Sequence, residues 1–363
     1  MKRLALFLVA GMVANIAFGQ NAKVVSAFNY LRNNQLDKAK EAIDAAALNE
    51  KTMGDPKTWF YKGNVYLALQ LSQEEAFKPL AKNALTIAKE SYEKALQLDD
   101  KDKYKMEIME RMPIIAEQYY NNGVNQYNAK NYTDAANYFM KARDLNKELG
   151  VTDTLAIFNA ALCSELSDNM PDAKSNYEQL VSHNYNNSLI YSSLATIYTK
   201  EKDTAAAYAI IAKGLQRFPE EFNLVIAETN LYLSQNKVKE AQASLKKAIT
   251  MDDTNPTLFF AVGTTYDQMG QKEEAKSAYK RAIELDPAYF DANYNLGALY
   301  VNQAAAIMEA ANALPLGDPK YDTEKAKADQ MLADALPYLE KANEIDPKEM
   351  NTLVTLKEIY ART

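Results

Sequence analysis

Three stretches decide the fold: AYAIIAKGLQRFPEE, beginning at Ala207, AQASLKKAITMDDTN, beginning at Ala241, and AKSAYKRAIELDPAY, beginning at Ala275. Their first residues lie 34 positions apart, and AKSNYEQLVSHNYNN begins another 34 positions upstream, at Ala173. A fixed period of this length is the signature of a repeat array. Within each period, apolar residues recur three and four positions apart over two stretches, which indicates two amphipathic helices joined by a short turn. We therefore predict four consecutive helical hairpins over residues 154–289.

The unit at 256–289 resembles the tetratricopeptide repeat (TPR). The positions that carry the resemblance are Phe259, Val262-Gly263, Tyr266, Ala275, Tyr279, Ala282 and Pro287. Extending the register outward predicts repeats at 20–53, 56–102, 116–153, 154–187, 188–221, 222–255, 256–289 and 290–349. A last helix at 350–363 is expected to cap the array. The resemblance implies an all-α fold, a right-handed superhelical solenoid of about eight TPR hairpins whose concave groove is lined mainly by the first helices.

Small residues recur where the two helices of a hairpin should meet. The position that opens the second helix is alanine in all eight units: Ala39, Ala88, Ala135, Ala173, Ala207, Ala241, Ala275 and Ala335. Glycine occupies the facing position of four first helices, at Gly63, Gly123, Gly263 and Gly297. Glycine inside a helix costs about 1 kcal/mol relative to alanine, so its recurrence predicts a close helix–helix contact.

Two units exceed the period at the turn between their helices, 56–102 by 13 residues and 290–349 by 26. The second insert is predicted to lengthen both helices of its hairpin, with Thr323 as the N-cap of the second helix. This long hairpin, residues 303–334, either packs only on itself and caps the array or binds a partner. Its candidate partner-binding residues are Ile307, Met308, Leu314 and Tyr321. Residues 103–113 fit no repeat and are predicted to extend the following helix.

The composition excludes several classes of function. The chain has 48 acidic and 41 basic residues and a net charge of -7, which disfavours nucleic acid as a partner. One cysteine, Cys163, permits no intramolecular disulfide and no cysteine-based zinc site, and one histidine, His183, permits no site with two imidazoles. No phosphate-binding or metalloprotease motif is present. We therefore expect neither enzymatic activity nor a cofactor or metal.

The first nineteen residues have the pattern of a secretory signal peptide. Lys2 and Arg3 precede an apolar stretch over 4–18, and small residues lead up to Gly19. An uncleaved membrane anchor is the alternative, although the apolar stretch is shorter than the ~20 residues of a membrane-spanning helix. We expect cleavage after Gly19 and a mature protein in the periplasm of a Gram-negative envelope, without a stable membrane span. Secretion beyond the periplasm is a second possibility.

The family geometry implies which side chains face the groove and are candidates for partner binding: Phe60, Asn64, Tyr120, Tyr127, Phe158, Glu165, Thr196, Ile226, Asn230, Phe260, Asp267 and Tyr294. This mixture suits an extended peptide or a helix, with apolar anchors and polar groups that orient the ligand. The competing interpretation is that the aromatic residues only shield the neighbouring helix. We expect a non-enzymatic scaffold or adaptor that binds a protein or peptide of the envelope; binding of glycan or peptidoglycan fragments is the alternative. The sequence carries no signal for the oligomeric state.

Overall fold

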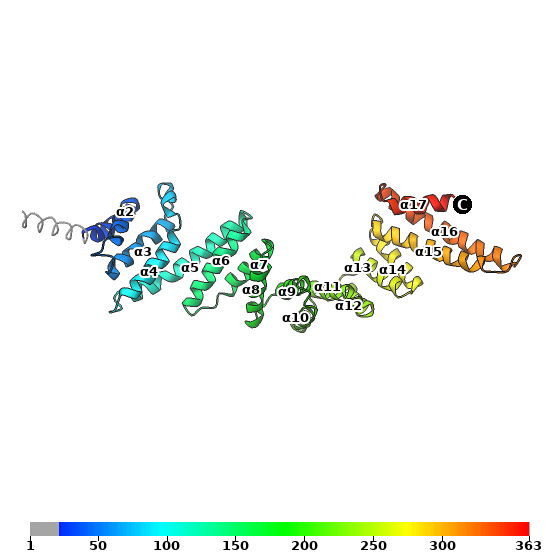
Figure 1. Ribbon diagram of the computed structural model, residues 1–363, viewed down its shortest axis with the longest axis horizontal. Helices are drawn as coiled ribbons and strands as arrows, with labels where there is room; N and C mark the ends of the chain where they lie inside the picture. Colours follow the sequence, from blue (N-terminus) through cyan, green and yellow to red (C-terminus); the bar gives the residue numbers. More distant parts are fainter. Residues whose placement is uncertain (1–21, 363) are drawn as a thin grey trace, which may run out of the picture. The chain divides into compact units, whose positions relative to one another are not determined.

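The computed structural model describes residues 22–362, and within them all regular structure is helical (Figure 1). The expected all-α class is therefore confirmed. The expected signal peptide, residues 1–19, lies outside the described residues. In the range 22–362, none of the helices combines the length and the apolar character that crossing a bilayer requires.

Contacts divide the chain into two compact units, a first that ends at Tyr185 and a second that begins at Asn186. The first unit opens with a helix over residues 22–32. It continues with α2 (Leu36–Ala47), α3 (Pro56–Leu71), the 3-10 helix η1 (Glu75–Ala81), α4 (Ala84–Leu98), α5 (Lys105–Asn128), α6 (Tyr132–Glu148), α7 (Thr154–Leu166) and α8 (Met170–Ser182). Within this unit α3 packs on α4, α5 on α6 and α7 on α8.

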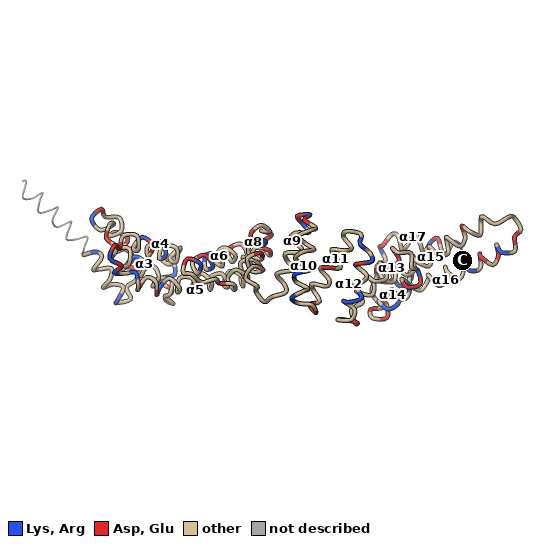
Figure 2. Tube along the Cα trace, turned by 90° about the horizontal axis from the view of Figure 1, so that it is seen from below, with Lys and Arg blue, Asp and Glu red and all other residues tan. Residues whose placement is uncertain are grey.

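The second unit repeats the same pairing. It consists of α9 (Leu189–Lys200), α10 (Thr204–Arg217), α11 (Phe222–Ser234), α12 (Val238–Met251), α13 (Pro256–Gln268), α14 (Lys272–Leu285), α15 (Phe290–Asn312), α16 (Lys320–Ile345) and α17 (Met350–Tyr360). Each of the first four pairs is an antiparallel hairpin, and α17 packs against α16. Acidic and basic residues are interspersed along both units (Figure 2).

The hairpins close through the small residues that the sequence singles out. All eight alanines that open the second helices are completely buried. A Cβ at Gly263 would lie 2.5 Å from ring atoms of Tyr279, and one at Gly123 would lie 2.8 Å from those of Phe139. Each of these rings belongs to the residue four positions after the alanine that opens the second helix of its hairpin. Glycine at these positions therefore makes room for a large side chain of the second helix.

The tight turn inside most hairpins contains one residue in the left-handed region. These residues are Asn34, Lys130, Asp168, Lys202, Asn236 and Gly270, with φ between 53° and 73°. Several helices then begin with a side-chain cap. At α3, for example, Asp55 accepts the Lys57 backbone N–H and Pro56 occupies the first turn, which satisfies one free donor and presets the helical φ.

The segments outside the 34-residue period contain helices of their own or lengthen those of the repeats. The first insert forms η1, which packs on α3. Residues 105–113 form the first turns of α5, as the sequence predicts. The second insert lengthens α15 and α16, but Thr323 does not cap α16, which begins at Lys320. The N-cap position is Pro319, four residues before Thr323, and Asp318 accepts the backbone N–H of Lys320 at the start of the helix.

Candidate peptide-binding groove

One face of α3 forms the first wall of a groove in the first unit. Lys57, Tyr61, Asn64, Ala68 and Leu71 are spaced four, three, four and three residues apart, so they share this face, and all five line the same hollow. At 1.5 Å per residue, the distance along the helix from the first to the last is about 21 Å.

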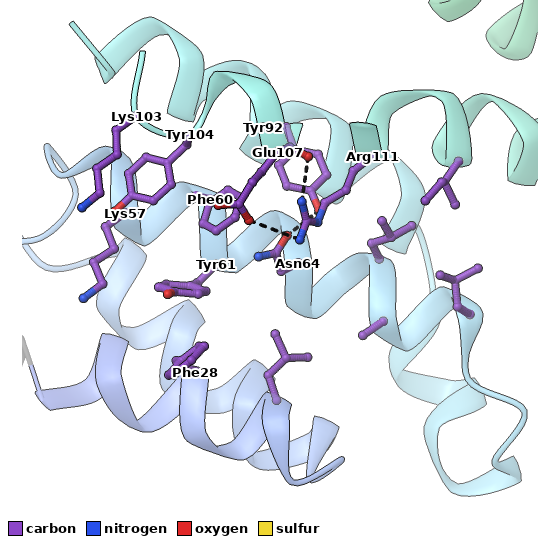
Figure 3. Close-up of a pocket in the computed structure, with 15 residues that line it drawn as sticks. Phe28, Lys57, Phe60, Tyr61, Asn64, Tyr92, Lys103, Tyr104, Glu107 and Arg111 are labelled. Carbon is purple, nitrogen blue, oxygen red and sulfur yellow. Dashed lines mark hydrogen bonds and ion pairs between the residues drawn. The ribbon is translucent and has the colours of Figure 1, made fainter. Parts of the chain in front are cut away.

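The opposite wall comes from the part of α5 that lies outside the repeats. Tyr104, Glu107, Arg111 and Ile114 line the hollow at helical spacing. Side chains from the helix at 22–32, the buried side of α3 and α4 complete it: Phe28, Leu31, Phe60, Leu67 and Tyr92. We call this hollow of about 700 Å³ the α3 groove (Figure 3). Lys103, which precedes Tyr104, also lines it.

Aromatic rings form its floor. Phe60 is only 3% exposed and stacks on Tyr104, with ring centroids 4.7 Å apart and planes at 24°. Tyr61 is half-buried, and its ring centroid lies 5.1 Å from that of Phe28. Burial raises the pKa of the Tyr61 hydroxyl, with smaller contributions from Tyr104 and Glu107. Tyr61 and Phe28 are therefore the rings that a ligand can reach, and the buried ring of Phe60 lies 5.3 Å from that of Tyr61.

Asn64 is the polar group at the centre of the groove. Its Oδ1 accepts a hydrogen bond of 2.7 Å from the hydroxyl of Tyr92. Tyr92 is completely buried, and burial raises the pKa of its hydroxyl, so this hydroxyl is a permanent donor. The bond fixes the orientation of the Asn64 amide. Among the described residues its Nδ2 has no hydrogen-bond acceptor, so it is free to donate to a ligand.

The cationic groups of the groove lie over its rings. The Arg111 guanidinium lies 5.4 Å from the centroid of Phe60 and donates a 2.7 Å hydrogen bond to the backbone oxygen of Glu107. The ammonium groups of Lys57 and Lys103 lie 5.9 and 5.1 Å from the rings of Tyr61 and Tyr104. Three cations and one carboxylate, that of Glu107, line the groove, a balance of +2 (3 minus 1).

The other candidate residues of the first unit have partners outside the α3 groove. Tyr120 accepts a hydrogen bond from Asn159, and Glu165 accepts one from Tyr177, each 2.7 Å long. The ring of Phe158 lies against that of Tyr185. Tyr127 is 39% exposed and contacts Tyr132. The structure thus brings only Phe60 and Asn64 of the expected set into this groove.

In the second unit, three candidates lie together and three do not. Thr196, Ile226 and Asn230 line a hollow of about 470 Å³ between α9, α10 and α11. The remaining candidates contact other residues of the chain: Phe260 the rings of Tyr279 and Tyr289, Asp267 the ammonium of Lys272, and Tyr294 the ring of Phe290.

The long hairpin packs mainly on itself. Ile307 and Met308 are half-buried against a cluster that contains Ala304, Ala328 and Leu332. Leu314 is also half-buried. Tyr321 is 37% exposed near the tip, and the neighbouring Leu316 is fully exposed.

Sequence reasoning missed Lys57, Tyr61, Lys103 and Arg111. The spacing of Lys57, Tyr61 and Asn64 along one helix was a signal that could have identified the first two. Arg111 lies in the segment that fits no repeat. The candidate residues were chosen at equivalent positions of the repeats, so this procedure could not select it.

No group of three or more His, Cys, Asp or Glu side chains within residues 22–362 is arranged to hold a metal ion. Cys163 is buried in α7, and burial raises the pKa of its thiol to about 11. This thiol is therefore protonated, and far less nucleophilic than a thiolate, at neutral pH.

Two family models match segments of the second unit. The tetratricopeptide repeat model matches residues 230–255, and a TPR repeat model matches residues 263–303. These matches support the tetratricopeptide repeat family, whose members are in general non-enzymatic scaffolds that bind protein or peptide partners.

Individual relatives are distant. The chain is 23% identical over 209 residues to the TPR repeat-containing protein YpiA of Bacillus subtilis, covering 54% of this chain and 47% of YpiA. It is 22% identical over 246 residues to anaphase-promoting complex subunit 3 of Schizosaccharomyces pombe, covering 66% of this chain and 36% of that protein. The chain thus spans about half or less of the length of these relatives.

Solved structures of TPR proteins are similar over part of the chain. One is YrrB, described as a TPR protein with an unusual peptide-binding site, which is 22% identical in sequence. The match covers 60% of this chain and 97% of YrrB, with a TM-score of 0.45. MamA of Desulfovibrio magneticus RS-1 is 15% identical and covers 54% of this chain and 96% of its own, with a TM-score of 0.43.

Proposed function

We propose that this protein is a non-enzymatic interaction scaffold that binds a segment of a partner protein in the α3 groove. The observation that carries the proposal is the groove itself. It is an open hollow of about 700 Å³, with a reachable ring at Tyr61 and a fixed amide at Asn64. Apolar anchors beside a few oriented polar groups are typical of surfaces that recognise polypeptides.

The length of the groove suits a polypeptide. A wall of about 21 Å accommodates roughly six residues of extended chain or about four turns of helix. The rings are less suited to glycans, the alternative ligand, because Phe60 and Tyr104 are buried.

Photo-crosslinking tests the site. A photoreactive phenylalanine analogue is placed at Tyr61, and at Lys78 of η1 as an exposed control outside the groove. In the cells that make the protein, we expect a defined protein adduct from position 61 and none from position 78. Equal adducts from both positions, or none from position 61, would contradict the proposal.

Calorimetry separates the proposal from the glycan alternative. Peptidoglycan fragments titrated into the protein are expected to release no heat. Heat that disappears in Tyr61→Ala would favour the glycan alternative and count against a protein partner.

The proposal includes export to the cell envelope, in the periplasm. Its support is the N-terminal sequence: two basic residues, an apolar stretch and small residues before Gln20. Fractionation of the producing cells, followed by N-terminal sequencing, is expected to find the protein in the periplasm with Gln20 first. A cytoplasmic protein that begins at Met1 would overturn this part of the proposal.

A further inference from the structure

The two ends of the α3 groove differ in chemistry. Lys57 lies in the first turn of α3, and Figure 3 shows it on the same side of the groove as Lys103. Leu71 is the last residue of α3 and is 42% exposed. Ile114 of α5, which is 36% exposed, follows Arg111 by three residues. The groove therefore has a cationic end and an aliphatic end, with Asn64 and Arg111 between them.

The lysines of the cationic end are not held in ion pairs by the chain itself. Within residues 22–362, neither Lys57 nor Lys103 forms an ion pair, and each ammonium lies beside a tyrosine ring. The Asp55 carboxylate also attracts Lys103, and Asp55, Asp99 and Asp100 line a neighbouring hollow with it. Arg111 is paired weakly, since its Nη2 lies 3.5 Å from Oε2 of Glu107. The side chains that line the groove carry a balance of +2, in a chain of net charge -7. An anionic ligand would gain the attraction that these groups do not obtain within the chain.

We propose, building on the function proposed above, that the α3 groove selects a partner segment with acidic side chains at one end and aliphatic side chains at the other. The segment binds in one orientation. Its carboxylates contact Lys57 and Lys103, and its aliphatic side chains contact Leu71 and Ile114. The Nδ2 of Asn64 donates to the backbone of the segment. Residues 103–114, which lie between two predicted repeats, supply two of these four side chains, Lys103 and Ile114.

Selection from a random peptide library tests the proposal without knowledge of the partner. A phage-displayed library of 12-residue peptides is selected on the purified protein and on Lys57→Glu/Lys103→Glu. A second variant, Lys57→Gln/Lys103→Gln, removes the charges without reversing them. The matched control, Lys78→Glu/Lys82→Glu, changes the net charge as much as the first variant but at exposed lysines that do not line the groove.

We expect the parent protein and the control to enrich peptides that combine Asp or Glu with Leu, Ile or Val. The glutamate variant should lose the acidic residues from its selected peptides and gain Lys or Arg. By fluorescence anisotropy, a parent-selected peptide should bind the glutamate variant at least tenfold more weakly, the glutamine variant with intermediate affinity, and the control unchanged. A peptide of reversed sequence should also bind at least tenfold more weakly.

Three results would overturn the inference. Neutral or basic peptides could displace the parent-selected peptide from the groove. The control variant could weaken binding of that peptide as much as the glutamate variant does, or the parent protein could bind the reversed peptide as tightly as the original. Each of these leaves the proposed function intact. If every selected peptide binds Tyr61→Ala as tightly as it binds the parent protein, the proposed function itself fails.

Discussion

Single residues set how closely the helices of a hairpin approach. Gly63 of α3 faces the ring of Tyr92 in α4, and a Cβ at position 63 would overlap that ring. The ring cannot retreat, because Tyr92 is completely buried and its hydroxyl is bonded to Asn64. One glycine therefore supports both the hairpin and the central amide of the α3 groove.

Gly63→Ala is expected to lower the free energy of unfolding of the first unit by up to about 2 kcal/mol. The overlap with Tyr92 costs about 1–3 kcal/mol and outweighs the gain in helix propensity. Gly54→Ala is the matched control, since a Cβ at position 54 meets nothing within 4 Å. Urea unfolding followed by circular dichroism measures both. Equal stability of the two variants would show that the α3–α4 contact is less close than described.

The thiol of Cys163 is expected to be unreactive in the folded protein. Its burial raises the pKa to about 11, so almost no thiolate forms at pH 8, and reagents cannot reach the sulfur. Labelling with a chromogenic disulfide reagent at pH 8 should be slow in buffer and rapid in denaturant. Rapid labelling in buffer would show that α7 opens readily.

At the scale of elements, the pairing of helices follows from residues within each hairpin. The small residues and the apolar period could be read from the sequence because each acts between helices adjacent in the chain. The α3 groove could not be read in this way. Its second wall comes from turns of α5 that fit no repeat, and Phe60, an expected ligand-facing residue, is its buried floor. A ligand can reach only some of the side chains on one face of a helix. Which ones it can reach depends on how the neighbouring helices pack, and the sequence of a single hairpin does not show this.

The contact between α2 and α3 contains a charged cluster that predicts a pH dependence. Asp44 of α2 accepts hydrogen bonds from Tyr66 at 2.8 Å and Lys40 at 3.0 Å, and its Oδ1 lies 3.1 Å from the ammonium of Lys62. Burial on its own raises the pKa of the Asp44 carboxyl, but these hydrogen bonds and charges outweigh it, and the pKa is lowered. The carboxylate form is therefore stabilised by folding.

Because the folded pKa is depressed, the stability from Asp44 is fully present above the unfolded value of about 4 and is lost as the pH falls through the folded value. At pH 7, Asp44→Asn is expected to lower the free energy of unfolding by about 1–2 kcal/mol, the loss of charge-assisted hydrogen bonds. At pH 3 the difference should be smaller. Urea unfolding at both pH values measures it, and a difference that is constant or larger at pH 3 would contradict this assignment.

At the scale of the whole molecule, the 34-residue period predicts one array over 20–363, and the contacts divide it into two compact units. The repeat period predicts which helices pair in each hairpin. It carries little information on how extensively successive hairpins contact one another, and therefore on where the array divides into units. In repeat proteins each hairpin contacts mainly its neighbours, so a unit with several hairpins can be stable alone. All residues of the α3 groove fall within positions 28–114, inside the first unit.

The two units are expected to fold separately. Residues 20–185 and 186–363, produced as separate chains, should each be helical and unfold cooperatively in urea. The first should bind a library-selected peptide as tightly as the full chain does. A fragment without a cooperative transition would contradict the division at Tyr185. Weaker binding by a folded first fragment would place part of the site in the second unit.

The central claim is that the α3 groove binds a polypeptide, and the affinity of a library-selected peptide for two tyrosine variants tests it most directly. Tyr61→Ala removes the reachable ring of the groove. Tyr127→Ala removes an exposed ring that does not line it. Fluorescence anisotropy should show at least about tenfold weaker binding to Tyr61→Ala, as for an interface anchor, and unchanged binding to Tyr127→Ala. Equal affinity of both variants and the parent protein would contradict the account.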